Sequence, residues 1–187
     1  MLESFDTVGV AGKGIRCYAC FNREMAERLG VAFDNAPLQP IAVTDADGIG
    51  HTFEIRSMLV ATGHSMEAVE VSGDGQHGYR FQVLGDYEAD ALNLFQHLYA
   101  KIRRELALRH LERTEWGWQI GAAQRLVGRI AWDPDTGGAV PLLVIDGKPF
   151  TWDQVGRMLV GFEGFSLDVR IMDSIEMVDD RGTEHDV

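Results

Sequence analysis

An alternating apolar and polar pattern between residues 41 and 84 constrains the fold more than any other feature of this sequence. The strings IAVT and HTFEIRSMLV flank the turn Asp45–Gly48 (DADG), and aspartate and glycine are residues that a hairpin loop favours. The string MEAVEV follows a turn at residues 62–64, and YRFQVL follows a turn at residues 72–75. Four short strands joined by tight turns predict an antiparallel meander.

Two helices are expected after the meander. The first runs from Asp86 to about Arg113 and is roughly 40 Å long, which is enough to cross a sheet. Acidic residues in its first turn and basic residues in its last third complement the helix dipole. Its apolar face is formed by Leu92, Phe95, Tyr99, Ile102 and Leu106. The second helix runs from Thr151 to Phe162 and opens with the capping-box spacing of Thr151 and Gln154. Its apolar face is formed by Trp152, Val155, Leu159 and Phe162.

The remaining elements are shorter. The string NREMAERL predicts a helix with Asn22 as its N-cap and Gly30 just past its end. RLVGRIAW and VPLLVID predict a second β segment, and residues 166–177 (SLDVRIMDSIEM) predict a final strand. The fold class is therefore α+β, with a mainly antiparallel sheet, one long and one shorter packed helix, and a small N-terminal CxxC element.

Three regions are expected along the chain. Residues 1–36 form the N-terminal CxxC-helix element, which Pro37 and Pro40 separate from the rest. Residues 37–178 form one α+β core domain. Residues 179–187 are polar and are expected to be a disordered tail.

Composition and charge exclude several classes of protein. The chain has 187 residues, with 17 Lys and Arg against 29 Asp and Glu, and a formal net charge of −12. This charge repels phosphate backbones and anionic lipid, so we expect neither bulk nucleic acid nor membrane as a partner. Basic residues between Lys101 and Arg113 could bind phosphate or an acidic partner, although a solvated helix end is the commoner explanation.

The compartment is also indicated by the sequence. The sequence contains no run of about 18 apolar residues, the length needed to span a membrane. A secretory signal has a basic region followed by an apolar one, and the N-terminus has neither in this order. Two cysteines in 187 residues are typical of a reducing compartment. We therefore expect a cytoplasmic protein.

The motif Cys17-Tyr18-Ala19-Cys20 is the one spacing in the chain with a recognised chemistry. Two thiolates at this spacing can chelate zinc, although a closed structural site needs four ligands. A thioredoxin-like dithiol is a second interpretation, and two small buried hydrophobic side chains are a third. All three interpretations stay open.

If the CxxC element has a function, we expect metal coordination. The residues before Cys17 (VGVAGKGIR) are too rich in glycine for the central strand from which redox CxxC motifs are presented. The expected ligands are Cys17, Cys20 and His51, which follows the Asp45–Gly48 turn. Another histidine, water or a second subunit would complete the shell, and zinc is the expected ion.

Other motifs give no support for catalysis. Gly9–Gly14 (GVAGKG) is too short for a phosphate-binding loop and lacks its hydroxyl residue. The DADG turn lies between strands and lacks the remaining calcium ligands of an EF-hand. No HExxH or GxSxG pattern occurs. No catalytic residue is therefore assigned.

Two stretches together resemble an uncharacterised bacterial family classed as a domain of unknown function. They are CYACFNREMAERLG near the start and PLLVIDGKPFTWDQVGRMLVGFEGF near the end. The resemblance implies a bacterial cytoplasmic protein and no particular activity. We expect a non-enzymatic binding or assembly module, with or without a structural metal, that binds an unknown protein partner or itself. The alternative is a thiol redox protein or enzyme that uses the Cys17/Cys20 dithiol.

Overall fold

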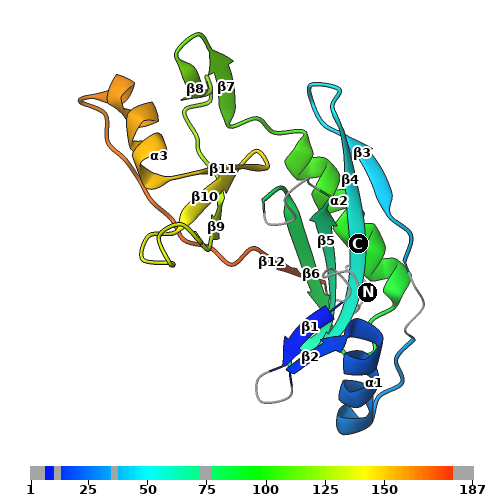
Figure 1. Cartoon of the computed structure of the whole chain (residues 1–187). Helices are drawn as coiled ribbons and strands as arrows, with labels where there is room; N and C mark the ends of the chain where they lie inside the picture. The colour runs from blue at the N-terminus through cyan, green and yellow to red at the C-terminus, as the bar shows by residue number, and fades with distance from the viewer. Residues whose placement is uncertain (1–6, 11–13, 35–37, 72–76, 179–187) are drawn as a thin grey trace.

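The largest sheet of the protein is built from consecutive hairpins, as the alternating pattern predicts (Figure 1). The computed structural model describes residues 7–10, 14–34, 38–71 and 77–178. Its five-stranded sheet has the order β12-β6-β5-β4-β3. The strands are β3 (Ile41–Thr44), β4 (Gly50–Val60), β5 (Gly63–Glu70), β6 (Arg80–Gly85) and β12 (Ile175–Met177). The first four are antiparallel neighbours, while β12 pairs parallel to β6.

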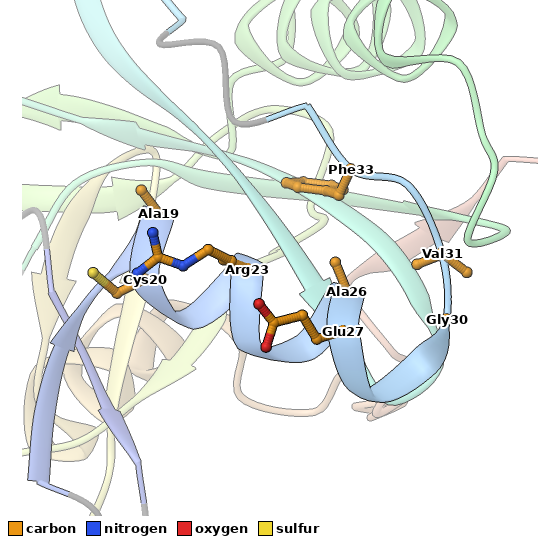
Figure 2. A pocket seen from close by; sticks show the side chains of 8 residues that line it. All are labelled: Ala19, Cys20, Arg23, Ala26, Glu27, Gly30, Val31 and Phe33. Atoms are coloured by element: carbon orange, nitrogen blue, oxygen red, sulfur yellow. The ribbon is translucent and has the colours of Figure 1, made fainter.

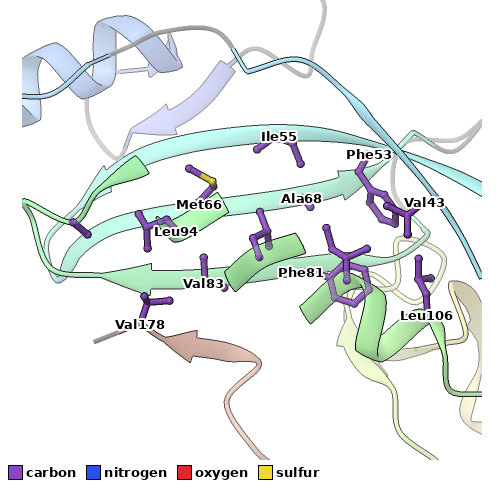
Figure 3. Packing of buried hydrophobic residues seen from close by; sticks show 13 residues of the cluster. Val43, Phe53, Ile55, Met66, Ala68, Phe81, Val83, Leu94, Leu106 and Val178 are labelled. Carbon is purple, nitrogen blue, oxygen red and sulfur yellow. The ribbon is translucent and has the colours of Figure 1, made fainter. Parts of the chain in front are cut away.

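Helix α2 (Ala91–Leu106) covers one face of this sheet. Its fully buried side chains recur every four residues, so a single stripe of the helix faces the strands. Figure 3 shows this core, in which α2 packs on Phe53 of β4, Met66 of β5 and Val83 of β6. The buried stripe of α2 consists of Leu94, Leu98, Ile102 and Leu106.

The expected helix Asp86–Arg113 is too long at both ends. Residues 86–89 form a turn, closed by the hydrogen bond from the Ala89 N–H to the Asp86 carbonyl, and Asp90 is the N-cap. The helix ends at Leu106 because the carboxylate of Asp146 accepts the N–H groups of His110 and Leu111. Those bonds draw the chain into the next strand, so the basic residues up to Arg113 do not share one helical face.

The apolar face expected for α2 is also partly wrong. Leu92 and Tyr99 are 63% and 37% exposed, while Leu94 and Leu98 are fully buried. Two apolar stripes of α2 overlap at Ile102 and Leu106. The sheet covers the stripe that also contains Leu94 and Leu98, whose residues lie four apart. Lys101 is buried beside this stripe, and its Nζ donates to the carbonyls of Gln82 (2.9 Å) and Ser174 (2.6 Å).

A second set of elements follows α2 and has its own buried cluster. It contains the hairpin β7 (Leu111–Thr114) and β8 (Gly117–Ile120), and an antiparallel sheet of order β11-β10-β9. The strands of that sheet are β9 (Arg129–Ala131), β10 (Leu142–Ile145) and β11 (Lys148–Phe150). Its buried cluster consists of Leu111, Ile145, Phe150, Val155 and Met158. The region 37–178, expected to be one core domain, thus contains two hydrophobic clusters.

Helix α3 (Trp152–Leu159) begins as predicted, with a complete capping box between Thr151 and Gln154. It continues as the 3₁₀ turn η2 (Val160–Phe162). The expected buried face is only partly correct. Val155 is buried, Leu159 and Phe162 are half-buried, and Trp152 is 47% exposed, whereas Met158, which lies outside the expected face, is buried. Val155 and Met158 lie three residues apart and pack into the second cluster, and α3 contacts β8 of the hairpin.

The final strand expected over residues 166–177 is reduced to β12. All residues from 163 to 174 are exposed. In Figure 1 this connection runs from α3 along the outside of the second sheet and back to the first.

The N-terminal element is a hairpin of β1 (Thr7–Val10) and β2 (Gly14–Cys17), followed by helix α1 (Tyr18–Leu29). The helix ends at Gly30, whose φ of 69° is the left-handed C-cap that the sequence predicts. It begins earlier than expected, because Cys17 is its N-cap and Asn22 lies inside it. The fold is thus α+β with mainly antiparallel sheets, as expected.

The structure does not test the expected disordered tail, and it tests the expected absence of a membrane span only in its described helices. The tail 179–187 and Pro37 lie outside the described residues. Among the described helices, none is long and apolar enough to cross a membrane.

Candidate functional site

Cys17 and Cys20 lie together in the first turn of α1. Cys17 has extended backbone angles at the end of β2, and its Sγ accepts the backbone N–H of Cys20 at 3.2 Å. A side chain that accepts this N–H is what helix capping requires. The CxxC spacing therefore places one sulfur at the helix N-cap and the other less than one turn further on.

Both thiols are accessible, so their interpretation as buried hydrophobic side chains is wrong. Cys17 is partly exposed and Cys20 is exposed, and neither is in a disulfide. The reason is the orientation of α1, which turns Asn22 toward β4. Asn22 is 2% exposed, donates to the Ser57 carbonyl (2.9 Å) and accepts the Leu59 N–H (3.0 Å). Residues two apart lie on opposite sides of a helix, so Cys20 faces outward.

The two thiols differ in acidity. The pKa of Cys17 is lowered because the side chain of Cys20 donates to it, and the backbone N–H of Cys20 adds to the effect. The pKa of Cys20 is raised, since the same hydrogen bond favours its protonated form. Cys17 is therefore the more readily formed thiolate, which is the form that binds metals and attacks electrophiles.

A shallow hollow of about 590 Å³ begins at Cys20 and follows α1 to the segment after it. Figure 2 shows Cys20 and Arg23 at one end, with Ala26, Val31 and Phe33 further along. The exposed thiol thus borders a mainly apolar surface that carries Arg23 near the sulfur and Glu27 further along.

His51, the third expected ligand, is not brought to the cysteines. It lies near the start of β4, whereas Tyr18 of α1 lies against Arg56, with 5.7 Å from the guanidinium to the ring. The strand between these positions spans roughly 15–20 Å. In the described ranges, no three His, Cys, Asp or Glu side chains form a group that could hold a metal ion.

His51 instead joins a buried polar cluster. Its Nε2 lies 2.9 Å from Oδ2 of Asp45, and its Nδ1 lies 2.6 Å from Oε1 of Glu70. Ionised carboxylates can only accept hydrogen bonds. Both contacts are therefore hydrogen bonds when both ring nitrogens carry protons.

Asp45 is the centre of this cluster, although the sequence indicates it only as a turn residue. Its side chain is 1% exposed, and it accepts the N–H groups of Asp47 and Ile49 and a bond from Arg109. Burial alone would raise the pKa of Asp45, but the hydrogen bonds outweigh burial and hold this pKa well below its ordinary value. The cluster ties the β3–β4 turn to the segment after α2, which is a structural role.

The second sheet meets this cluster at the turn between β10 and β11. Asp146 and Gly147 have φ of 47° and 70°, as a two-residue hairpin turn requires. A Cβ at Gly147 would lie 2.9 Å from the ring of Tyr79, so glycine permits the close approach. Burial raises the pKa of Tyr79, with Asp146 adding to the effect.

Ser57 and His64 form a contact that no sequence motif indicated. Oγ of Ser57 lies 2.6 Å from Nε2 of His64, and Nδ1 of His64 lies 3.4 Å from the Ala89 carbonyl oxygen. His64 is 4% exposed and Phe33 packs edge-on against it, at 4.9 Å between ring centroids. Burial lowers the pKa of His64 and favours its neutral form. Ser57 is only partly buried, and the contact links β4 to β5.

Family comparisons divide the chain at the end of α2. Residues 34–107 match a family model described as domain of unknown function DUF7686, and residues 110–176 match one described as domain of unknown function DUF7713. No curated protein and no solved structure matches the chain. The expected membership of an uncharacterised family is confirmed, and the CxxC motif precedes both matches. Two successive regions of the chain are thus similar to two different domains of unknown function, DUF7686 and DUF7713, and they follow a hairpin and helix that carry Cys17 and Cys20.

Proposed function

We propose that this protein is a non-enzymatic binding module in which Cys17 and Cys20 bind Zn²⁺ together with ligands of a partner protein. The observation that carries the proposal is the pair of accessible sulfur atoms in the first turn of α1, linked through the Cys20 N–H. Two thiolates supply half of a tetrahedral zinc shell. The partner supplies the other two positions.

The charge state of the pair supports metal binding. Zinc binds thiolates, so ligation displaces the thiol protons. The lowered pKa of Cys17 reduces the cost of the first deprotonation, and a bound cation offsets the cost of the second. His51 is left out of the proposed ligand set because Asp45 and Glu70 occupy both of its ring nitrogens.

The way the motif is presented favours metal over redox chemistry. A redox CxxC motif is associated with a βαβ unit. Here the strand before the motif is β2, which pairs antiparallel with β1 in a two-stranded hairpin. Cys20 is exposed as well, so its sulfur is accessible to a metal ion.

A reversible dithiol is the second candidate, and the lowered pKa of Cys17 is the observation that favours it. The Cys17 thiolate would attack a disulfide of a partner, form a mixed disulfide and release one partner thiolate. Cys20 would then lose its proton to solvent, attack Sγ of Cys17 and release the second partner thiolate. Two electrons would pass from the dithiol to the partner disulfide.

Competition between the protein and a coloured zinc chelator tests the proposal. The reduced metal-free chain, its C17A and C20A variants, and H51A as the matched control are each titrated with Zn²⁺. We expect zinc uptake by the parent chain and H51A and at least a tenfold weaker affinity in either cysteine variant. Zinc should also slow alkylation of both thiols in the parent chain.

Two results would contradict the zinc proposal. One is equal zinc affinity of the parent chain and the cysteine variants. The other is rapid alkylation unaffected by zinc, together with quantitative Cys17–Cys20 disulfide formation in a glutathione redox buffer. The second result would support the dithiol candidate.

A further inference from the structure

The connection between α3 and β12 carries a row of apolar side chains that are largely exposed in the described part of the chain. Phe165, Leu167, Val169 and Ile171 are 66%, 70%, 70% and 82% exposed. They alternate with polar residues, so they would lie on one face of an extended strand. Single exposed apolar residues are ordinary, but a continuous row of them marks an interaction site.

This row is the part of the predicted final strand that has no strand partner. Across the described residues, the backbone of residues 166–172 belongs to none of the sheets. The side chains of Asp168 and Arg170 contact each other at 3.0 Å, and they are 74% and 78% exposed. A contact between residues two apart agrees with an extended backbone, in which both point to the same side.

The segment is fixed at both ends. At its start, the Phe165 N–H donates to the Phe162 carbonyl, and the two rings pack edge to face. At its end, Lys101 binds the Ser174 carbonyl, and β12 pairs with β6. A strand held at both ends loses less conformational entropy when it pairs with another strand.

The sequence of the segment is complementary to itself. Residues 167–171 read LDVRI, with one acid and one base placed symmetrically about Val169. In an antiparallel pair centred on Val169, Leu167 faces Ile171 of the second strand. Asp168 then faces the second strand's Arg170, so opposite charges meet on both sides of Val169.

We propose that residues 167–171 pair antiparallel with the same residues of a second copy of this chain, about a two-fold axis at Val169. A two-fold contact uses the same surface on both chains, and the LDVRI pattern meets that condition in apolar matching and in charge. The proposal concerns a different surface from the cysteines and does not depend on zinc.

The small area of the contact indicates a weak dimer. Pairing would bring Leu167, Val169 and Ile171 of the two chains side by side, but the outer face of this row would stay in water, because a strand pair covers only the flanks of its side chains. A standard interface buries ~800 Å² per partner. The dimer should therefore dissociate on dilution, with a dissociation constant in the micromolar range.

Charge reversal at the two facing positions tests the pairing. In D168R, the introduced arginine would face Arg170 of the second copy, and in R170D two aspartates would face each other. Each single variant should dimerise at least tenfold more weakly than the parent chain in sedimentation equilibrium. The double variant D168R/R170D restores opposite charges and should dimerise like the parent chain.

Mixing the two single variants gives the sharpest result. A chain with two arginines faces a chain with two aspartates, so we expect a heterodimer from two monomeric proteins. D135R, which makes the same charge change at an exposed turn, is the matched control and should dimerise normally. Because the substituted side chains are about three-quarters exposed, the variants should keep the parent circular dichroism spectrum.

Three results would overturn the pairing. The parent chain could remain monomeric at about 100 µM, the single variants could dimerise as well as the parent, or the mixed variants could fail to associate. The second result would place the self-association on another surface.

Discussion

Cys17 occupies a helix position that serine, threonine, aspartate or asparagine usually fills. A sulfur atom is a weaker acceptor than oxygen when protonated, but a thiolate accepts strongly and interacts favourably with the helix N-terminus. The capping position thus favours the ionised form of Cys17.

Cys17 should react with iodoacetamide faster than Cys20 at pH 7–8. Its pKa is lowered by the Cys20 side chain and N–H while that of Cys20 is raised, so its thiolate fraction exceeds that of Cys20. Peptide mass spectrometry of briefly alkylated protein measures both rates across pH. C20A should shift the Cys17 rate profile to higher pH, while C20S, which keeps a donor, should shift it less. Equal rates at the two cysteines would contradict the assigned hydrogen bond.

Asp45 should contribute stability that depends on pH. Its folded-state pKa lies below its ordinary value, so its contribution is complete above about pH 4, where the unfolded chain is ionised. The contribution is lost as the pH falls toward the folded-state pKa. D45N should lower the free energy of unfolding by about 3 kcal/mol at pH 7, because Arg109 loses its buried partner.

The control for Asp45 is Asp47, which binds the same arginine but has a side chain that is 61% exposed. D47N should cost less than about 1 kcal/mol. Urea unfolding at pH 7 and pH 3 compares the variants, and the deficit of D45N should shrink at the lower pH. A deficit that is the same at both pH values would show that the carboxylate charge is not responsible.

At the scale of elements, turns and helix caps set by neighbouring residues could be predicted from the sequence, whereas features set by distant residues could not. The Asp45–Gly48 turn, the Thr151 capping box and Gly30 act within a few residues, and the structure confirms all three. The end of α2 depends instead on Asp146, far along the chain. A sequence pattern cannot show which distant carboxylate accepts a helix-terminal N–H.

In the candidate site, too, the local part could be predicted from the sequence and the long-range part could not. The spacing of Cys17 and Cys20 indicated the pair, because both thiols lie on one helical turn. The place of His51 follows from strand register, which pairs it with Val43 and brings its ring to Asp45 and Glu70. The Asp45–Gly48 turn alone does not determine that register.

Helix α3 should depend on Met158 rather than on its tryptophan. Met158 is 4% exposed in the second cluster, so M158A should lower the free energy of unfolding by roughly 2–5 kcal/mol. W152A, at a side chain 47% exposed, should cost less than about 1 kcal/mol. Chemical denaturation measures both values, and a larger loss from W152A would support the face expected from the sequence.

Helix α1 should depend on Asn22. N22A leaves the Ser57 carbonyl and the Leu59 N–H without this partner beneath the helix, at a cost of roughly 2–4 kcal/mol. E27A, on the exposed side, should be nearly neutral. Hydrogen exchange should show faster exchange over α1 in N22A than in E27A. Unchanged exchange over α1 would mean that other contacts hold the helix on β4.

At the scale of the whole molecule, each family match contains most or all of one hydrophobic cluster, and residues 107–110 link the two clusters. Arg109 of that segment binds Asp45 and Asp47 of the first domain, and His110 binds Asp146 of the second. The two matched regions are thus connected by charge and hydrogen bonds, and also by the pairing of β12 with β6. The cysteine pair precedes both domains, and the uncovered 165–171 row lies within the second.

The central claim is that Cys17 and Cys20 form the metal-binding part of this protein. The most direct test is elemental analysis of the chain purified without added metal or chelator, beside the C17A/C20A variant purified in the same way. We predict zinc in the parent protein, at one ion for each pair of chains or for each complex with a partner, and none in the variant. Zinc-free parent protein with both thiols free and reactive would contradict the claim.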